Sequence, residues 1–138
     1  MTHYKKLTNT LYWIALAGLF LWFAYTKGWI LANFPSIDAR TAITMIENDD
    51  NVTLLDVRTV PEFKEGHLRG ATLIPLQQLD THIGQLAGRK ETKILVYCRS
   101  GNRSVAASRI LEQHGFTPVN IKGGIMTLQS AGAEVVRE

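Results

Sequence analysis

The sequence predicts an α/β fold in which helices cover a central parallel sheet, preceded by one long apolar helix. Two observations indicate this. After residue 34, short apolar runs alternate with segments whose apolar residues recur at helical spacing, a pattern typical of parallel sheets with helices on both faces. Before that point, residues 11–25 carry no charge and are almost wholly apolar. We therefore expect a membrane anchor with its flanks at 1–34, and at 35–138 a three-layer domain with about five strands.

The apolar segment has the length of a membrane span. Its uncharged interval covers residues 7–26, between Lys5 and Lys6 on one side and Lys27 on the other. As a helix it would be roughly 30 Å long, about the thickness of the hydrocarbon core of a bilayer. A buried core helix is disfavoured because the run is apolar on every face. A cleaved leader remains an alternative, although no small-x-small cleavage motif follows. The sequence favours a retained anchor with residues 7–26 in the lipid bilayer.

The charge distribution bears on partners and on membrane orientation. The net charge of +3 comes from the three lysines around the apolar run, because residues 35–138 hold 12 basic and 12 acidic side chains. No nucleic-acid partner is therefore indicated. The two lysines before the span outweigh Lys27, which favours a single-pass protein with a cytoplasmic amino terminus and its domain on the periplasm-like face. Arg40 on the other side makes this bias small.

Within the domain, apolar patterning predicts the elements in order. Ser36 is expected to cap a first helix, with Asp38 in its first turn. Strands are predicted at 52–55, 71–74, 93–97 and 118–121. Helices are predicted at 76–86, 104–114 and 125–131.

Cys98 is the single cysteine of the chain, so an internal disulfide, a cysteine-based metal cluster and a pair of redox thiols are excluded. It directly follows the predicted strand 93–97, at the sheet edge where ligands bind in parallel folds. The residues after it are cationic, small or able to form hydrogen bonds: Arg99, Ser100, Gly101, Asn102, Arg103 and Ser104. A glycine-containing turn that enters a helix directs N–H groups inward, and Arg99 and Arg103 can add positive charge. We expect Cys98 to ionise readily and act as a nucleophile. An inert cysteine would be expected among apolar neighbours instead.

Four ordered segments resemble the rhodanese family. They are Cys98–Ser104, the run from Leu54 to Ala71 containing LLDVR, Glu62-Phe63 and GHLRGA, then Ile74-Pro75-Leu76, and Gly115 to Gly132 with its Gly123-Gly124 pair. The resemblance implies a rhodanese-like fold and a sulfurtransferase without a cofactor. It implies that Cys98 takes sulfur from thiosulfate or a related small anion, and that the loop N–H groups from Arg99 to Arg103 stabilise the persulfide. With no second cysteine, the acceptor must be external: cyanide, a small thiol or a protein thiol.

Other readings of these motifs remain. Cell-cycle phosphatases resemble this fold, but their loop has five residues between cysteine and arginine, whereas four lie between Cys98 and Arg103. A membrane-tethered binding or persulfide-relay module without thiosulfate turnover is the alternative function. Asp56 and Arg58 follow a strand at the same sheet edge, where they either tune the site or form a fixed pair that braces its loops. His67 is expected to hold a turn. The scattered histidines show no metal-ligand spacing.

Overall fold

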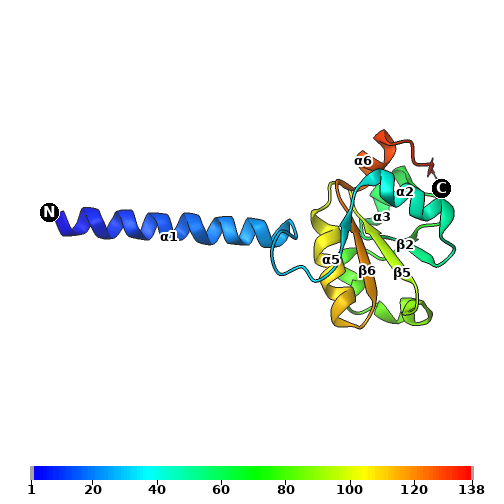
Figure 1. Cartoon of the computed structure of the whole chain (residues 1–138), viewed down its shortest axis with the longest axis horizontal. Coiled ribbons are helices and arrows are strands. Elements are labelled where there is room, and N and C mark those ends of the chain that lie inside the picture. The colour runs from blue at the N-terminus through cyan, green and yellow to red at the C-terminus, as the bar shows by residue number, and fades with distance from the viewer. Residues whose placement is uncertain (1, 138) are drawn as a thin grey trace. The chain divides into compact units, whose positions relative to one another are not determined.

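The computed structural model describes residues 2–137, which form two compact units with a boundary between Ala32 and Asn33. The first is a single helix with the short segment that follows it, and the second is the α/β domain (Figure 1). The sequence placed the boundary between residues 34 and 35, close to this division.

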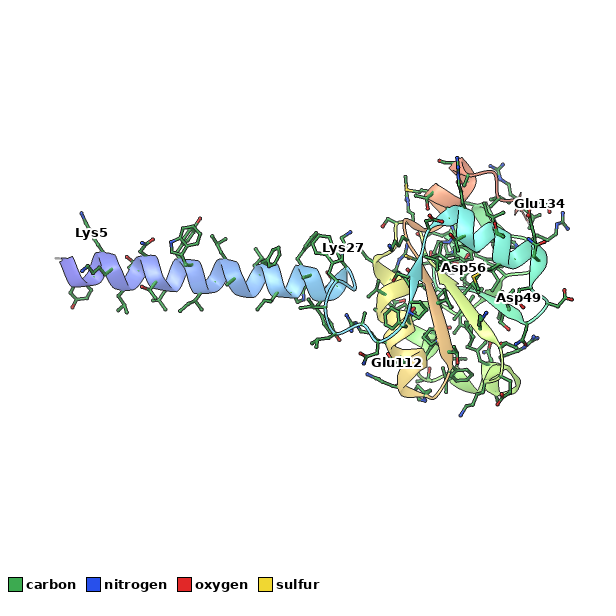
Figure 2. All side chains as sticks on the ribbon, viewed as in Figure 1. Lys5, Lys27, Asp49, Asp56, Glu112 and Glu134 are labelled. Atoms are coloured by element: carbon green, nitrogen blue, oxygen red, sulfur yellow. The ribbon has the colours of Figure 1, made fainter. Side chains whose placement is uncertain are left out.

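The first unit consists mainly of α1, Thr2–Thr26. Its 25 residues correspond to a helix roughly 37 Å long. Large apolar side chains are exposed along it, and Figure 2 shows Lys5 and Lys27 near its two ends. Residues 4–26 have the length and composition of a membrane span, a test that a signal sequence near an amino terminus also passes.

The domain is built on a five-stranded sheet with the order β1-β6-β5-β2-β4. Every neighbouring pair is parallel, which confirms the predicted architecture. The strands are β1 Ser36–Ile37, β2 Val52–Asp56, β4 Thr72–Leu73, β5 Lys93–Tyr97 and β6 Thr117–Ile121. The central β5 is buried from Ile94 to Tyr97, as expected of a parallel strand covered on both faces. A separate antiparallel ribbon pairs β3, His67–Leu68, with β7, Val135–Val136.

Helices cover both faces of the sheet and complete three layers (Figure 1). On one face, α2 (Ala39–Asn48) and α6 (Gly124–Ser130) pack over Leu95 and Tyr97. On the other, α4 (Leu76–Leu79), the 3₁₀ helix η1 (Ile83–Arg89) and α5 (Asn102–Gln113) pack over Ile94 and Val96. Alternate residues of β5 therefore enter opposite cores, as the period of a strand requires.

Three predicted elements differ in the structure. Ser36 is not a helix cap but lies in β1, where its Oγ accepts a hydrogen bond from Asn120; Asp38 caps α2 instead by accepting from the Thr41 N–H. The helix predicted at 76–86 is divided into α4 and η1, consistent with the low helix propensity of Gly84 and Gly88. The helix predicted from Ser104 begins at Asn102.

Candidate active site

Cys98 lies at the carboxyl end of β5, where the chain leaves the sheet for the loop that leads into α5. Its Sγ atom accepts a hydrogen bond from the Gly101 N–H at 3.1 Å, and its thiol donates to Ser104 Oγ at 3.6 Å. The residue is 1% exposed and belongs to the same buried apolar cluster as Val57 and Ala107. The sulfur therefore lies where the apolar core ends and the polar loop begins.

The shape of the loop depends on Gly101. Its φ of +105° lies in the region that favours glycine, and it caps the amino terminus of α5. Ser104 Oγ donates to the Gly101 carbonyl at 3.2 Å, which ties the loop to the first turn of the helix. This turn presents the Gly101 N–H to the sulfur, so one of the N–H contacts expected from the sequence is present at Cys98.

The start of α6 holds the loop from outside. The Ile125 N–H donates to the Cys98 carbonyl at 2.8 Å, and the Met126 N–H donates to the Arg99 carbonyl at 3.4 Å. Gly124 permits this approach, because a Cβ atom there would lie 2.5 Å from both the carbonyl carbon and the oxygen of Arg99 and closer still to the Cys98 oxygen. Gly124 is thus a packing requirement of the Cys98 loop.

Gly124→Ala should reduce sulfur transfer by about 100-fold, because its Cβ must displace the backbone of Cys98 and Arg99 by a substantial fraction of an ångström. The matched control is Gly132→Ala, at a position with φ of +96° and nothing within 4 Å of the added atom. Both substitutions strain the backbone, but only the first pushes on the loop. Initial rates of the two variants measure the difference, and equal rates would show that the contact does not matter.

Arg103 forms an ion pair that the sequence did not indicate. Its two terminal nitrogens donate to the two carboxylate oxygens of Glu62, each at 2.8 Å. Glu62 belongs to α3, Val60–Glu65, where it also forms a capping box with Thr59. The Arg103 hydrogen bonds, together with those of Thr59, lower the pKa of Glu62 to about 2. The pair therefore fastens α3 to the beginning of α5.

Glu62→Gln should lower the free energy of unfolding by about 2 kcal/mol at pH 7. Because the folded pKa is depressed below the usual value of 4.5, the carboxylate stabilises the fold above that value and loses this effect as the pH falls toward 2. The difference from the parent should therefore shrink between pH 5 and pH 2.5. Thermal unfolding across this range measures it, and a constant difference would contradict the assignment.

Asp56 and Arg58 form the fixed pair that the sequence suggested. The Arg58 Nη2 atom lies 2.7 Å from Asp56 Oδ2 and donates also to the Gly66 carbonyl, at 2.7 Å. The two residues are 0% and 5% exposed. Burial, followed by the negative charge of Asp56, raises the pKa of the neighbouring Tyr97, which accepts a hydrogen bond from the Leu68 N–H. The pair thus joins the ends of β2 and β5 to the turn at Gly66.

His67 lies in that turn and is buried. Its Nδ1 atom lies 2.9 Å from the Phe63 carbonyl, and its ring stacks on Phe63 at 3.6 Å between centroids. These contacts agree with the expected role of holding the turn. Among residues 2–137, no group of three or more His, Cys, Asp or Glu side chains could hold a metal ion.

The remaining loop residues face outward. Arg99, Ser100 and Asn102 are exposed, whereas Ser104 is buried beneath the loop. With Arg103 bound to Glu62, Arg99 is the loop cation that has no ion pair in the described part of the chain. A small anion that approaches the loop therefore meets one exposed guanidinium and the N–H groups of the turn.

A comparison with protein-family models decides the family. Residues 38–131 match the rhodanese-like domain. The chain belongs to the rhodanese-like family. This match spans β2, β4, β5 and β6, the Cys98 loop and the start of α6, so it covers every part of the site described above.

Known members of the rhodanese-like family include sulfurtransferases similar to this chain. A sulfurtransferase of Allochromatium vinosum is 30% identical over 101 residues, which cover 72% of this chain and 92% of the relative. Thiosulfate sulfurtransferase PspE of Escherichia coli is 34% identical over 51% of this chain and 68% of its own length. The chain spans 46% of a third relative, the putative sulfur carrier protein YrkF of Bacillus subtilis. The homologues support a rhodanese-type transferase.

A solved rhodanese structure confirms the fold. The rhodanese-related protein of Thermoplasma volcanium superposes with a TM-score of 0.69 at 33% identity, covering 76% of this chain and all of that one. The apolar helix α1 lies outside the family match, which begins at residue 38.

Sequence reasoning missed the role of Glu62. Thr59 and Glu62 carry the S/T-x-x-E signature of a capping box, which would have predicted α3. The partnership with Arg103 joins residues 41 positions apart and has no local signal.

Proposed function

We propose that this protein is a membrane-anchored sulfurtransferase that carries sulfane sulfur on Cys98 from thiosulfate or a related small anion to an external acceptor. The observation that carries the proposal is the Cys98 sulfur at the end of β5, 3.1 Å from the Gly101 N–H. An N–H group at that position stabilises negative charge on a thiolate or on a persulfide. The sulfurtransferase relatives support this use of the site.

The reaction proceeds in two displacements. The Cys98 thiolate attacks the outer sulfur of thiosulfate, the S–S bond of the donor breaks, and sulfite leaves with the bonding electrons. Cys98 then carries one additional sulfur as a persulfide. An acceptor thiolate or cyanide attacks that outer sulfur, and the Cys98 thiolate leaves. No cofactor takes part, and a hydroxyl such as that of Ser104 can rotate to donate to whichever sulfur is charged.

The burial of Cys98 favours a small donor. At 1% exposure, Cys98 offers almost no open surface to a large donor. A persulfide places its outer sulfur about 2 Å further out, where the acceptor attacks it. The short loop, with four residues between Cys98 and Arg103, suits this single atom better than a phosphoryl group with its oxygens.

A turnover assay tests the proposed function. Full chain in non-ionic detergent is mixed with thiosulfate and cyanide, and thiocyanate is measured; a small thiol replaces cyanide in a second series. We expect turnover that saturates with thiosulfate. A protein that accepts sulfur on Cys98 from polysulfide but never from thiosulfate would be the persulfide-relay module instead.

The anchor is tested separately. We propose that residues 7–26 of α1 lie in the bilayer, that they are retained, and that Cys98 faces the periplasm-like side. Because Cys98 is buried, intact cells are first treated with a denaturant that unfolds proteins on their outer face without lysing the cells. A membrane-impermeant thiol reagent should then label the chain. Labelling only after lysis would indicate the opposite orientation, with Cys98 on the cytoplasmic side. A shortened chain in the soluble fraction would indicate a cleaved leader.

A further inference from the structure

Two large apolar side chains are exposed on the described part of the domain, and both belong to helices that are bonded to the segment after Cys98. Among residues 33–137 as described, these exposed side chains are Val60, at 46%, and Met126, at 54%. Val60 is in the first turn of α3, two residues before the Glu62 that binds Arg103. Met126 is in the first turn of α6, and its N–H donates to the Arg99 carbonyl. The exposed apolar surface of the domain thus flanks the site from two elements.

The Cys98 loop adds an exposed cation near these elements. Arg99 is exposed and has no ion pair among the described residues, whereas Arg103 is paired with Glu62. We call Val60, Arg99 and Met126 the rim of the site. Exposed apolar side chains together with a guanidinium are complementary to a chain segment that carries an apolar residue and a carboxylate.

The position of the sulfur limits what can use this surface. Cys98 is buried below the rim, so an acceptor thiol must extend inward from whatever covers Val60 and Met126. A second copy of this chain does not qualify, because its one cysteine is buried in the same way. Cyanide and small thiols are too small to cover the apolar side chains of the rim, so their binding gains no free energy from burying that surface.

We propose that the rim docks a partner protein that presents its accepting cysteine on a protruding segment, with an apolar residue and an acidic residue beside that cysteine. This proposal rests on the proposed function and names its acceptor. The partner thiolate attacks the outer sulfur of the Cys98 persulfide, the Cys98–sulfur bond breaks, and the Cys98 thiolate leaves, so the step needs no oxidant or reductant.

The test measures how fast the full chain, carrying a persulfide on Cys98 in non-ionic detergent, transfers the outer sulfur to an acceptor. Cys98 is loaded with thiosulfate, and the loss of the added sulfur to cysteine peptides is followed by intact mass. One peptide carries leucine and aspartate beside its cysteine, and a matched peptide carries serine and asparagine. Each rate is divided by the rate of the same peptide with a small disulfide, because an acidic neighbour itself changes thiol reactivity. We expect the leucine–aspartate peptide to react at least about fivefold faster.

Variants connect this preference to the rim. Val60→Ser combined with Met126→Ser should abolish most of the preference, while loading by thiosulfate and discharge to cyanide stay unchanged. Gln129→Ser, at another exposed position of α6, is the control and should keep the preference. Equal rates for the two peptides, or a preference that survives the double substitution, would overturn the proposal.

Two further outcomes are distinguished. If thiosulfate does not load Cys98, the proposed function fails; the rim is then tested on full chain loaded with inorganic polysulfide, with the same criteria. The parent chain is also reconstituted in anionic vesicles, where lipid bound to the rim would slow discharge to a small thiol. If the double substitution removes that slowing but leaves discharge to the peptides unchanged, the rim binds lipid and the proposal is wrong.

Discussion

Cys98→Ser should reduce thiocyanate formation from thiosulfate and cyanide by at least about 10⁴-fold. The change replaces one atom in a buried position, so packing against Val57 and Ala107 is nearly preserved. A serine hydroxyl at this position stays protonated and forms no persulfide. The measurement is the initial rate of the variant beside that of the parent chain.

The control for this prediction is the midpoint of thermal unfolding, which should agree between parent and variant within a few degrees. A variant that folds normally and keeps more than about 1% of the parent rate would contradict the role given to Cys98, because loss of a catalytic nucleophile costs far more.

Asp56→Ala should lower the free energy of unfolding by about 3–5 kcal/mol. It leaves the buried Arg58 guanidinium with the Gly66 carbonyl as its one described hydrogen-bond acceptor within residues 2–137 and with the Tyr97 ring beside it, and a buried charge without its counter-ion is costly. Thermal unfolding of the full chain measures the change. Figure 2 shows Asp56 inside the domain and Glu134 at its surface.

That contrast supplies the control. Glu134 forms an ion pair with Arg69 at the same 2.7 Å separation, but both side chains are about two-thirds exposed (66% and 64%). Glu134→Ala should therefore change stability little, because water screens an exposed pair. In addition, Asp56→Leu with Arg58→Met should be more stable than Asp56→Ala alone, since no charge is then left buried. Equal losses of unfolding free energy for Asp56→Ala and Glu134→Ala would contradict the stabilising role given to the Asp56–Arg58 pair.

The sheet and the position of Cys98 could be predicted because their signals are local. The run from Lys93 to Tyr97 is apolar enough to be a buried strand, and the glycine and polar residues after it indicate a loop. The two-residue strand β1 gave no such signal, because Ser36 and Ile37 become a strand only through pairing with β6. Tertiary pairing overrode the capping propensity of Ser36.

The electrostatics of the site could not be predicted for a similar reason. The position of Arg103 close to Cys98 in the chain predicts a charge at the loop, but it does not predict the partner Glu62, which lies on a helix 41 residues earlier. Likewise, the contact of Gly124 with the Cys98 backbone joins segments that a single sequence cannot place together. The fold brings α3, α5 and α6 to one edge, and this determines which charge is left to meet a substrate.

Intact mass spectrometry of the full chain after incubation with thiosulfate tests the central claim most directly. The account predicts a gain of one sulfur atom, localised to Cys98, that disappears when cyanide or a thiol is added and never forms in Cys98→Ser. A chain that stays unmodified while a control rhodanese gains sulfur under the same conditions would contradict it.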